Sequence, residues 1–172
     1  MVNTNFAHGP RRSTFEAQDT YTRLANTTQY TAGDAISDHA TTPTVLDFSV
    51  GKIKGAGGKI NNVVITKTNT TLTSAAWHLY LFDTTIAVAG IKDNLVDAIT
   101  AAEWLTCIGF LEILEADWEA NATTAIWNKS NLDIPFVPGV STTSIFGALI
   151  ADATYTPASG EVISVMLSGE QD

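Results

Sequence analysis

Short segments in which apolar and polar side chains alternate recur along almost the whole chain, separated by glycine, proline, asparagine and aspartate. Alternation with a period of two, over about four to eight residues between turn residues, is typical of half-buried β-strands. The clearest segments are 44–50, 60–70, 75–83, 107–114, 125–138, 144–152 and 162–170. With one or two further strands expected in residues 21–43, the sequence predicts an all-β domain of about eight or nine short strands, as a β-sandwich, jelly roll or Greek-key barrel.

Composition supports this fold class and excludes some partners. Threonine occupies 25 of the 172 positions, and β-branched residues favour pleated, half-buried surfaces. A net charge of −9 and a pI near 4.6 argue against a nucleic-acid partner, which requires a basic face. No stretch is long and apolar enough for a membrane span, so we expect no membrane partner.

Charge is distributed unevenly along the chain. Residues 1–67 carry seven basic and five acidic side chains, whereas residues 68–172 carry two basic and thirteen acidic ones. This asymmetry suits a protein whose basic N-terminal part meets another surface while the acidic body faces solvent. Ordinary scatter of charges on a solvated surface explains it equally well.

The first 20 residues differ from the rest of the chain. They show no periodicity, contain Gly9-Pro10 and two arginines, and have only Phe6 and Phe15 as large apolar side chains. This composition predicts an extended N-terminal arm, residues 1–20, attached to a single domain, residues 21–172.

The segment WHLYLF, residues 77–82, carries large apolar or aromatic side chains on both faces of the expected strand. One face would carry Trp77, Leu79 and Leu81, and the other His78, Tyr80 and Phe82. A strand of this kind has to be covered on both sides, by a second layer of the same chain or by another subunit.

Residues with catalytic or metal-binding chemistry are not grouped in the sequence. The three histidines, at positions 8, 39 and 78, lie far apart, and none has a partner at metal-ligand spacing. Cys107 stands in an apolar run, which indicates a buried thiol rather than a nucleophile. No nucleophile-elbow motif accompanies the many hydroxyl groups. The sequence therefore predicts no enzyme, no cofactor and no metal.

Three other sets of side chains leave binding interpretations open. Asp83, Asp93, Asn94 and Asp97 could bind Ca²⁺, although a helix cap or Asx turn explains them more simply. Glu112, Glu115, Asp117 and Glu119 could include a glycosidase pair, or form an exposed acidic loop. Trp104, Trp118 and Trp127 could stack on sugars, or belong to the core and to interfaces.

The stretches WHLYLFDTTIAVAGIKDN (77–94), WLTCIGFLEI (104–113) and SIFGALIADATYTPAS (144–159) together resemble a group of tailed-bacteriophage virion proteins. The shared pattern is a strand ending in Leu-Phe-Asp, a loop reaching Asp-Asn, a short helical turn, a strand starting around Ile-Gly, and a late strand with Gly-Ala-Leu. The similarity covers about residues 30–170. It implies a structural protein that is made in the host cytoplasm and incorporated into the virion.

The resemblance and the arm together favour a capsid decoration, or cement, protein that binds the outer surface of the major capsid shell and stabilises it. The expected capsid-binding residues of the arm are Phe6, Arg11, Arg12 and Phe15. The expected interface of a homotrimer consists of His78, Tyr80 and Phe82. The alternative is a tail-associated or receptor-binding module that contacts host surface glycans through its tryptophan-bearing loops.

Overall fold

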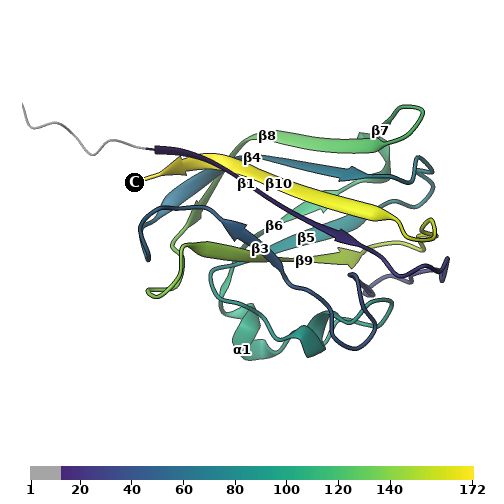
Figure 1. Cartoon of the computed structure of the whole chain (residues 1–172), viewed down its shortest axis with the longest axis horizontal. Coiled ribbons are helices and arrows are strands. Elements are labelled where there is room, and N and C mark those ends of the chain that lie inside the picture. The colour runs from purple at the N-terminus through teal and green to yellow at the C-terminus, as the bar shows by residue number, and fades with distance from the viewer. Residues whose placement is uncertain (1–12) are drawn as a thin grey trace, which may run out of the picture.

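The computed structural model describes residues 13–172, which form two antiparallel five-stranded sheets packed face to face (Figure 1). The strands are β1 (Ser13–Thr22), β2 (Ala35–Ile36), β3 (Leu46–Ser49), β4 (Gly58–Lys67), β5 (Trp77–Phe82), β6 (Cys107–Ile113), β7 (Glu119–Ala120), β8 (Ala125–Phe136), β9 (Ser144–Ala151) and β10 (Val162–Gln171). The short helices are η1 (Val88–Ile91), α1 (Ala101–Trp104) and η2 (Glu115–Asp117). No helix in this part of the chain is long and apolar enough to cross a membrane. The prediction of an all-β sandwich is confirmed.

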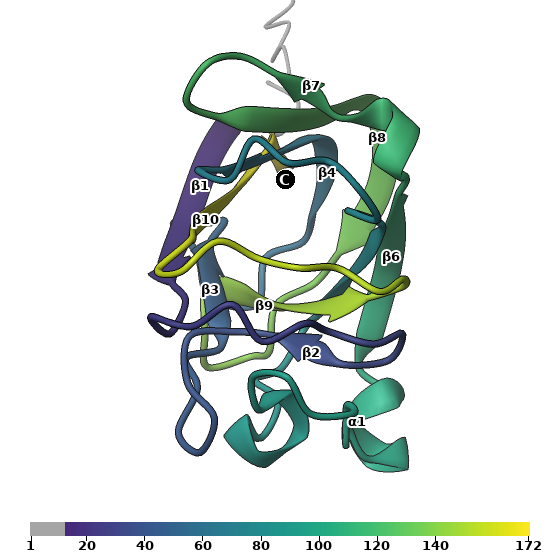
Figure 2. The ribbon, with the colours of Figure 1, turned by 90° about the vertical axis from the view of Figure 1, so that its right-hand side faces the viewer.

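The order of the strands is that of a jelly roll. One sheet has the order β1-β10-β4-β8-β7, and the other has the order β2-β9-β5-β6, with β3 also paired to β9. Without the two-residue strands β2 and β7, eight strands remain, and the first lies beside the last. The chain passes repeatedly from one sheet to the other, as in the double Greek key of jelly rolls. Figure 2 shows the sandwich from one end.

The main core lies between the sheets and follows from the alternation of side chains. In β10, inward residues such as Ile163 and Val165 are fully buried, while their neighbours in the sequence are partly exposed. From the opposite sheet, β5 contributes Trp77, Leu79 and Leu81 to the same cluster of buried side chains. Burial of these apolar surfaces is the largest favourable contribution to folding.

A second layer covers the outer face of β5. The connection between β5 and β6, residues 83–106, contains η1 and α1 and lies beneath the sheet that includes β9 (Figures 1 and 2). Its residues Ile86, Ile91 and Ile99 form a separate buried cluster with Phe82 and Ile150. The apolar character of β5 on both faces therefore has an intramolecular cause along part of the strand.

The helix α1 begins with a capping box formed by Thr100 and Glu103. The Thr100 side chain accepts a hydrogen bond from the backbone N–H of Glu103, and the Glu103 carboxylate accepts one from the backbone N–H of Thr100, at 2.7 Å. Backbone hydrogen bonds from the N–H groups of Ala87 and Thr100 to its carboxylate lower the pKa of Glu103, because they stabilise the charged form. A helix of four residues gains its stability from such local bonds and from packing, since helix propensity alone is insufficient.

The boundary between arm and domain differs from the predicted one. Residues 13–22 form β1 and pair in register with β10, from Ser13 opposite Gln171 to Thr22 opposite Val162. Residues 13–20 of the predicted arm are therefore part of the sandwich. Residues 1–12, with Phe6, Arg11 and Arg12, lie outside the described residues.

Candidate interaction surfaces

The predicted oligomer interface is only partly exposed. Phe82 is fully buried in the second cluster, beneath the connection between β5 and β6. Tyr80 is half-buried, and its ring lies 4.8 Å from that of Trp104 in an edge-to-face arrangement. Only the part of this face near His78 is open, where the side chain of Phe110 is 58% exposed. Phe82 therefore belongs to the core and is not available to another subunit.

A second candidate surface lies where residues 1–12 join the sandwich; we call it the arm end. It consists of the start of β1, the glycine-rich loop 51–57, and the segment 136–142, which follows β8. Backbone hydrogen bonds hold these parts together, from Gly55 N–H to Thr142 O at 3.2 Å and from Asp172 N–H to Gly57 O at 3.0 Å. The arm end is thus an ordered platform formed by segments from distant parts of the sequence.

The glycines of this loop are required by its geometry. Gly55 adopts a φ of +69°, in the left-handed region that favours glycine. A Cβ atom on Gly58 would lie 2.3 Å from the carbonyl oxygen of Glu170, so that a side chain cannot be accommodated there. The glycine-rich sequence therefore serves close backbone packing.

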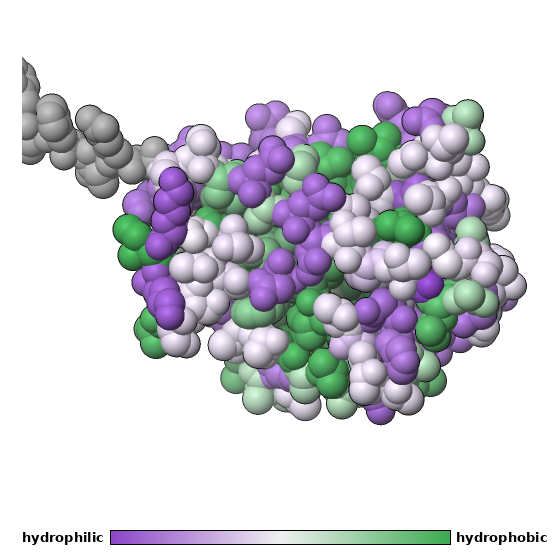
Figure 3. Space-filling view, in the orientation of Figure 1, coloured by the Kyte–Doolittle hydropathy of each residue, from purple (hydrophilic) through white to green (hydrophobic). Residues whose placement is uncertain are grey.

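Exposed apolar side chains gather at the arm end. Ile53, Val137 and Val140 are 63%, 60% and 93% exposed, and loop 51–57 touches the segment that carries the two valines. A shallow, mostly apolar hollow of about 320 Å³ lies beside them, lined by Asp83, Ile108, Pro135, Phe136 and Val137. On the face seen in Figure 3, hydrophobic residues are otherwise scattered among polar ones. Apolar side chains exposed together in this way are typical of contact sites.

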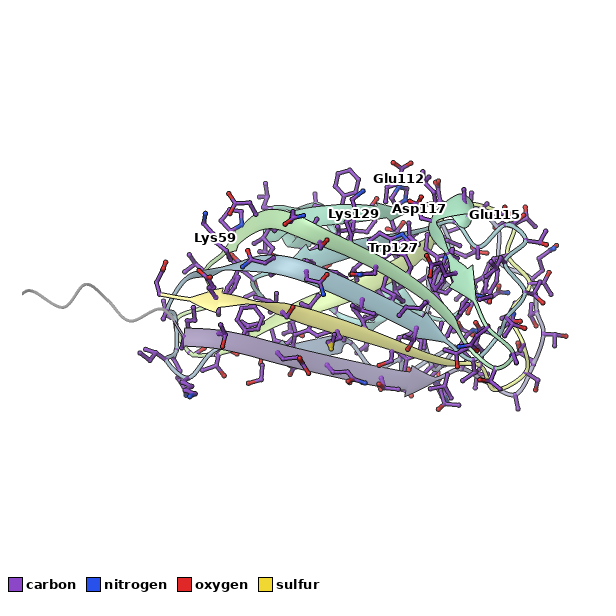
Figure 4. All side chains as sticks on the ribbon, turned by 90° about the horizontal axis from the view of Figure 1, so that it is seen from above. Lys59, Glu112, Glu115, Asp117, Trp127 and Lys129 are labelled. Atoms are coloured by element: carbon purple, nitrogen blue, oxygen red, sulfur yellow. The ribbon has the colours of Figure 1, made fainter. Side chains whose placement is uncertain are left out.

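Basic side chains accompany the apolar ones. Lys52 and Lys54 are exposed on loop 51–57, and Lys59 forms an ion pair of 2.6 Å with Asp133. Figure 4 shows Lys59 near the arm end and Glu115 and Asp117 towards the opposite end of the sandwich. The arm end thus carries three lysines, but Asp83, Asp133, Glu170 and Asp172 also lie there, so this end is mixed in charge.

Phe15 lies in β1 and packs into the sandwich. Its ring contacts that of Phe136 edge to face, with centroids 5.5 Å apart, and it joins the main core from its edge. Of the four predicted arm residues, Phe15 thus stabilises the platform from which the first twelve residues extend. Sequence reasoning missed Ile53 and Val140; their signal was an apolar side chain isolated in a turn-rich segment.

Two of the three tryptophans proposed to stack on sugars are core residues. Trp118 and Trp127 are both buried in the main cluster between the sheets. The indole N–H of Trp118 donates a hydrogen bond of 2.7 Å to the carbonyl oxygen of Ala75, and its ring packs edge to face on Trp77. Neither Trp118 nor Trp127 is available to a glycan, so the glycan interpretation of these two residues is wrong.

Asp93 is an internal ion-pair partner rather than a calcium ligand. Its carboxylate accepts hydrogen bonds from Arg23 at 3.1 Å, from the hydroxyl of Tyr30, and from the backbone N–H of Ser37 at 3.1 Å. Arg23 and Asp93 are almost completely buried. The three contacts tie the connection between β5 and β6 to the segment that follows β1.

A second buried ion pair joins Lys67, at the end of β4, to Glu161, which precedes β10. The Lys67 ammonium donates hydrogen bonds of 2.7 Å to the carbonyl oxygens of Asn69 and Thr71, and lies 3.9 Å from the Glu161 carboxylate. The Tyr155 hydroxyl donates to the same carboxylate at 2.7 Å. Burial raises the pKa of Glu161 and lowers that of Lys67 to about 8, because both charged forms lose hydration.

The titration of Lys67 predicts that stability rises with pH between about 8 and 10. In this range unfolded Lys67 keeps its proton while the folded residue loses it, so the unfolded state binds more protons and the free energy of unfolding increases by roughly 2 kcal/mol. Above pH of about 10 the sign reverses, because burial raises the pKa values of Tyr21, Tyr30 and Tyr155 and only the unfolded tyrosines ionise. Urea unfolding from pH 7.5 to 11 measures both the rise and the later fall in the free energy of unfolding. The rise should be absent in Lys67→Met, and a wild-type stability that is flat between pH 8 and 10 would contradict the assignment.

Comparisons with known proteins give no family for this chain. No protein-family model matches it, and no curated protein matches it. A solved chain of Desmodium yellow mottle tymovirus aligns with a TM-score of 0.31 and 10% identity, covering 95% of this chain and 82% of that one. A chain of turnip yellow mosaic virus aligns over the same shares with a TM-score of 0.27 and 10% identity. Because both TM-scores are below 0.5, neither likeness carries an argument about function.

Proposed function

We propose that this protein is a structural component of a tailed-phage virion, a decoration protein that binds the outer surface of the major capsid shell and stabilises it. The arm end carries the proposal. There exposed apolar side chains, with Lys52 and Lys54, surround the point at which residues 1–12, with Phe6, Arg11 and Arg12, join the sandwich. Its mode of action is binding, without catalysis.

The fold supports this proposal without being sufficient for it. Jelly rolls occur in viral capsid proteins, lectins and cupins, so the architecture is compatible with several functions. The resemblance of residues 77–94, 104–113 and 144–159 to phage virion proteins favours the first of these. The residues of the two buried ion pairs bond within the chain, and the buried tryptophans pack in the core, which leaves the exposed surfaces to carry function.

Binding would combine steering and anchoring. The arginines and Lys52 and Lys54 meet capsid carboxylates, which sets the register and accelerates encounter. Phe6 and the exposed side chains of Val137 and Val140 supply apolar anchors in grooves between capsid subunits. The acidic opposite end then faces solvent.

We also propose a homotrimer at a three-fold or quasi-three-fold position of the capsid. The open part of the β5–β6 face, with His78, the edge of Tyr80, and Phe110, is the surface that another subunit would cover. Light scattering of the purified protein tests this directly, because a trimer has three times the mass of the 18.3 kDa chain.

Deletion of residues 1–12 tests the capsid contact. We expect the truncated protein to keep its unfolding midpoint, because β1 begins at Ser13, and to bind capsids lacking this protein at least about tenfold more weakly. Cosedimentation with such capsids measures the loss. Arg11→Ala with Arg12→Ala should give a smaller loss that diminishes as salt is raised.

Matched variants distinguish the arm end from the opposite end of the sandwich. Val140→Ser removes an apolar side chain from the arm end and should weaken capsid binding, whereas Leu114→Ser, at the exposed side of the opposite end, should not. If the truncated protein bound capsids as tightly as the wild type does, the proposed contact between residues 1–12 and the capsid would be contradicted. Binding to host cells or purified surface glycan, without capsid binding, would favour the tail-associated or receptor-binding alternative.

A further inference from the structure

We propose that His78, Glu112 and Asp152 form a Zn²⁺-binding site on the outer face of the second sheet. One ligand atom from each side chain lies within 4.8 Å of the other two. The Nδ1 atom of His78 is 3.7 Å from a carboxylate oxygen of Asp152. This proposal is independent of the capsid contact, since the arm end lies at the other end of β5, but it shares His78 and the β5–β6 face with the proposed trimer contact.

Three adjacent segments of the sheet place these ligands on one face. His78 on β5 lies directly opposite Glu112 on β6 and opposite Ile150 on β9. Asp152 follows Ile150 by two residues and therefore points to the same side, and its backbone N–H continues the ladder by donating to Ala76 O at 2.8 Å. Cβ atoms of directly opposite residues lie about 4.5–5.5 Å apart, which is within reach of a shared ion.

The imidazole of His78 is held in place by aromatic neighbours. The rings of Tyr80 and Phe110 both lie 5.8 Å from it, and these two residues are directly opposite each other on β5 and β6. A ligand whose rotamer is fixed by packing on a central strand loses little entropy when it binds a metal. Glu112 and Asp152 are exposed and can adjust.

The charge of the cluster favours a cation. Two carboxylates converge on the imidazole, and within residues 13–172 neither forms an ion pair with a lysine or arginine. An ion pair between His78 and Asp152 alone is a simpler arrangement than a metal site, but such a pair does not involve Glu112. The dependence of metal binding on Glu112 therefore separates the two arrangements.

The donor set selects the metal. One imidazole nitrogen with two carboxylate oxygens suits Zn²⁺, whose bonds of about 2.0–2.2 Å to such ligands require only small rotations of Glu112 and Asp152. Ca²⁺ and Mg²⁺ prefer all-oxygen shells with more ligands. In the single chain, water completes the coordination, because Glu112 and Asp152 are exposed.

Isothermal titration calorimetry of the isolated protein with ZnCl₂ tests the site. We expect one Zn²⁺ per chain, and affinity at least about tenfold lower in each of His78→Gln, Glu112→Gln and Asp152→Asn. Two matched controls, His39→Gln at an exposed histidine and Glu16→Gln on the other sheet, should bind as the wild type does. Co²⁺ should bind with the visible absorption of a site containing nitrogen and oxygen ligands.

Zn²⁺ should also raise the unfolding midpoint of the wild type, because a ligand that binds only the folded state stabilises it, whereas Mg²⁺ should not. The absence of heat with millimolar Zn²⁺ would overturn the proposal. Binding that survives in Glu112→Gln and Asp152→Asn, whose exposed side chains have no part in folding, would overturn it equally. If the protein did not bind capsids, the measured Zn²⁺ binding would still test the metal site by itself.

Discussion

Replacement of Phe82 by alanine is expected to lower the free energy of unfolding by about 3–5 kcal/mol, because it removes a fully buried ring and leaves a cavity. Phe82 packs among Ile86, Ile91 and Ile99 beneath the connection that covers β5. The loss should appear in urea unfolding as a lower midpoint with little change in slope. Because the ring does not reach the surface, the oligomeric mass at concentrations where the protein stays folded should not change.

Phe110→Ala is the matched control for this prediction. Phe110 lies on the same outer face but is 58% exposed, so its loss should cost about 1 kcal/mol or less. If the open part of this face is a subunit interface, Phe110→Ala should weaken the oligomer while Phe82→Ala does not. A loss of oligomer in Phe82→Ala without loss of stability would contradict the placement of Phe82 in the core.

The contrast between these two residues shows what the alternating pattern could and could not predict. A period of two identified β5 and both of its apolar faces, but it contains no information on which molecule covers the second face. The covering segment, residues 83–106, has isoleucines at irregular spacing and no strand or long helix, so nothing in its sequence indicated a layer. Irregular segments bury side chains through tertiary contacts that local periodicity does not record.

The arm boundary was misplaced for a related reason. β1 does alternate, with Phe15, Ala17 and Tyr21 directed inward, but one of these is small and the intervening residues are polar or charged. Its average hydrophobicity is therefore low, although its pairing with β10 extends over ten residue pairs. A strand at the edge of a sheet is stabilised mainly by its backbone ladder, which composition does not reveal.

Buried charges could not be paired from the sequence. Arg23 and Asp93 are separated by 70 positions, and each stands in a turn-rich segment where a solvated side chain is the ordinary expectation. Likewise, His78, Glu112 and Asp152 come together only once the order of β6, β5 and β9 is known. The fold class followed from local patterns, whereas these sites required the register of the strands.

Asp93→Ala is expected to destabilise the protein by about 3–5 kcal/mol, because it leaves the guanidinium of Arg23 buried without its counter-charge. It also removes the acceptor for the hydroxyl of Tyr30 and for the backbone N–H of Ser37. These groups hold residues 83–106 against the sandwich. Hydrogen exchange should therefore show the largest loss of protection in that connection, in addition to a lower unfolding midpoint.

Asp97→Ala provides the control within the same connection. Asp97 is half-buried and its backbone N–H bonds Gly33 O, a contact that alanine preserves, so the change should stay within about 0.5 kcal/mol. Asp93→Asn, which keeps an acceptor but removes the charge, should fall between the two variants. If Asp93→Ala and Asp97→Ala lowered the free energy of unfolding by equally small amounts, the ion pair would not be the contact that holds residues 83–106 against the sandwich. The covering of β5, including the burial of Phe82, would then depend on the isoleucines alone.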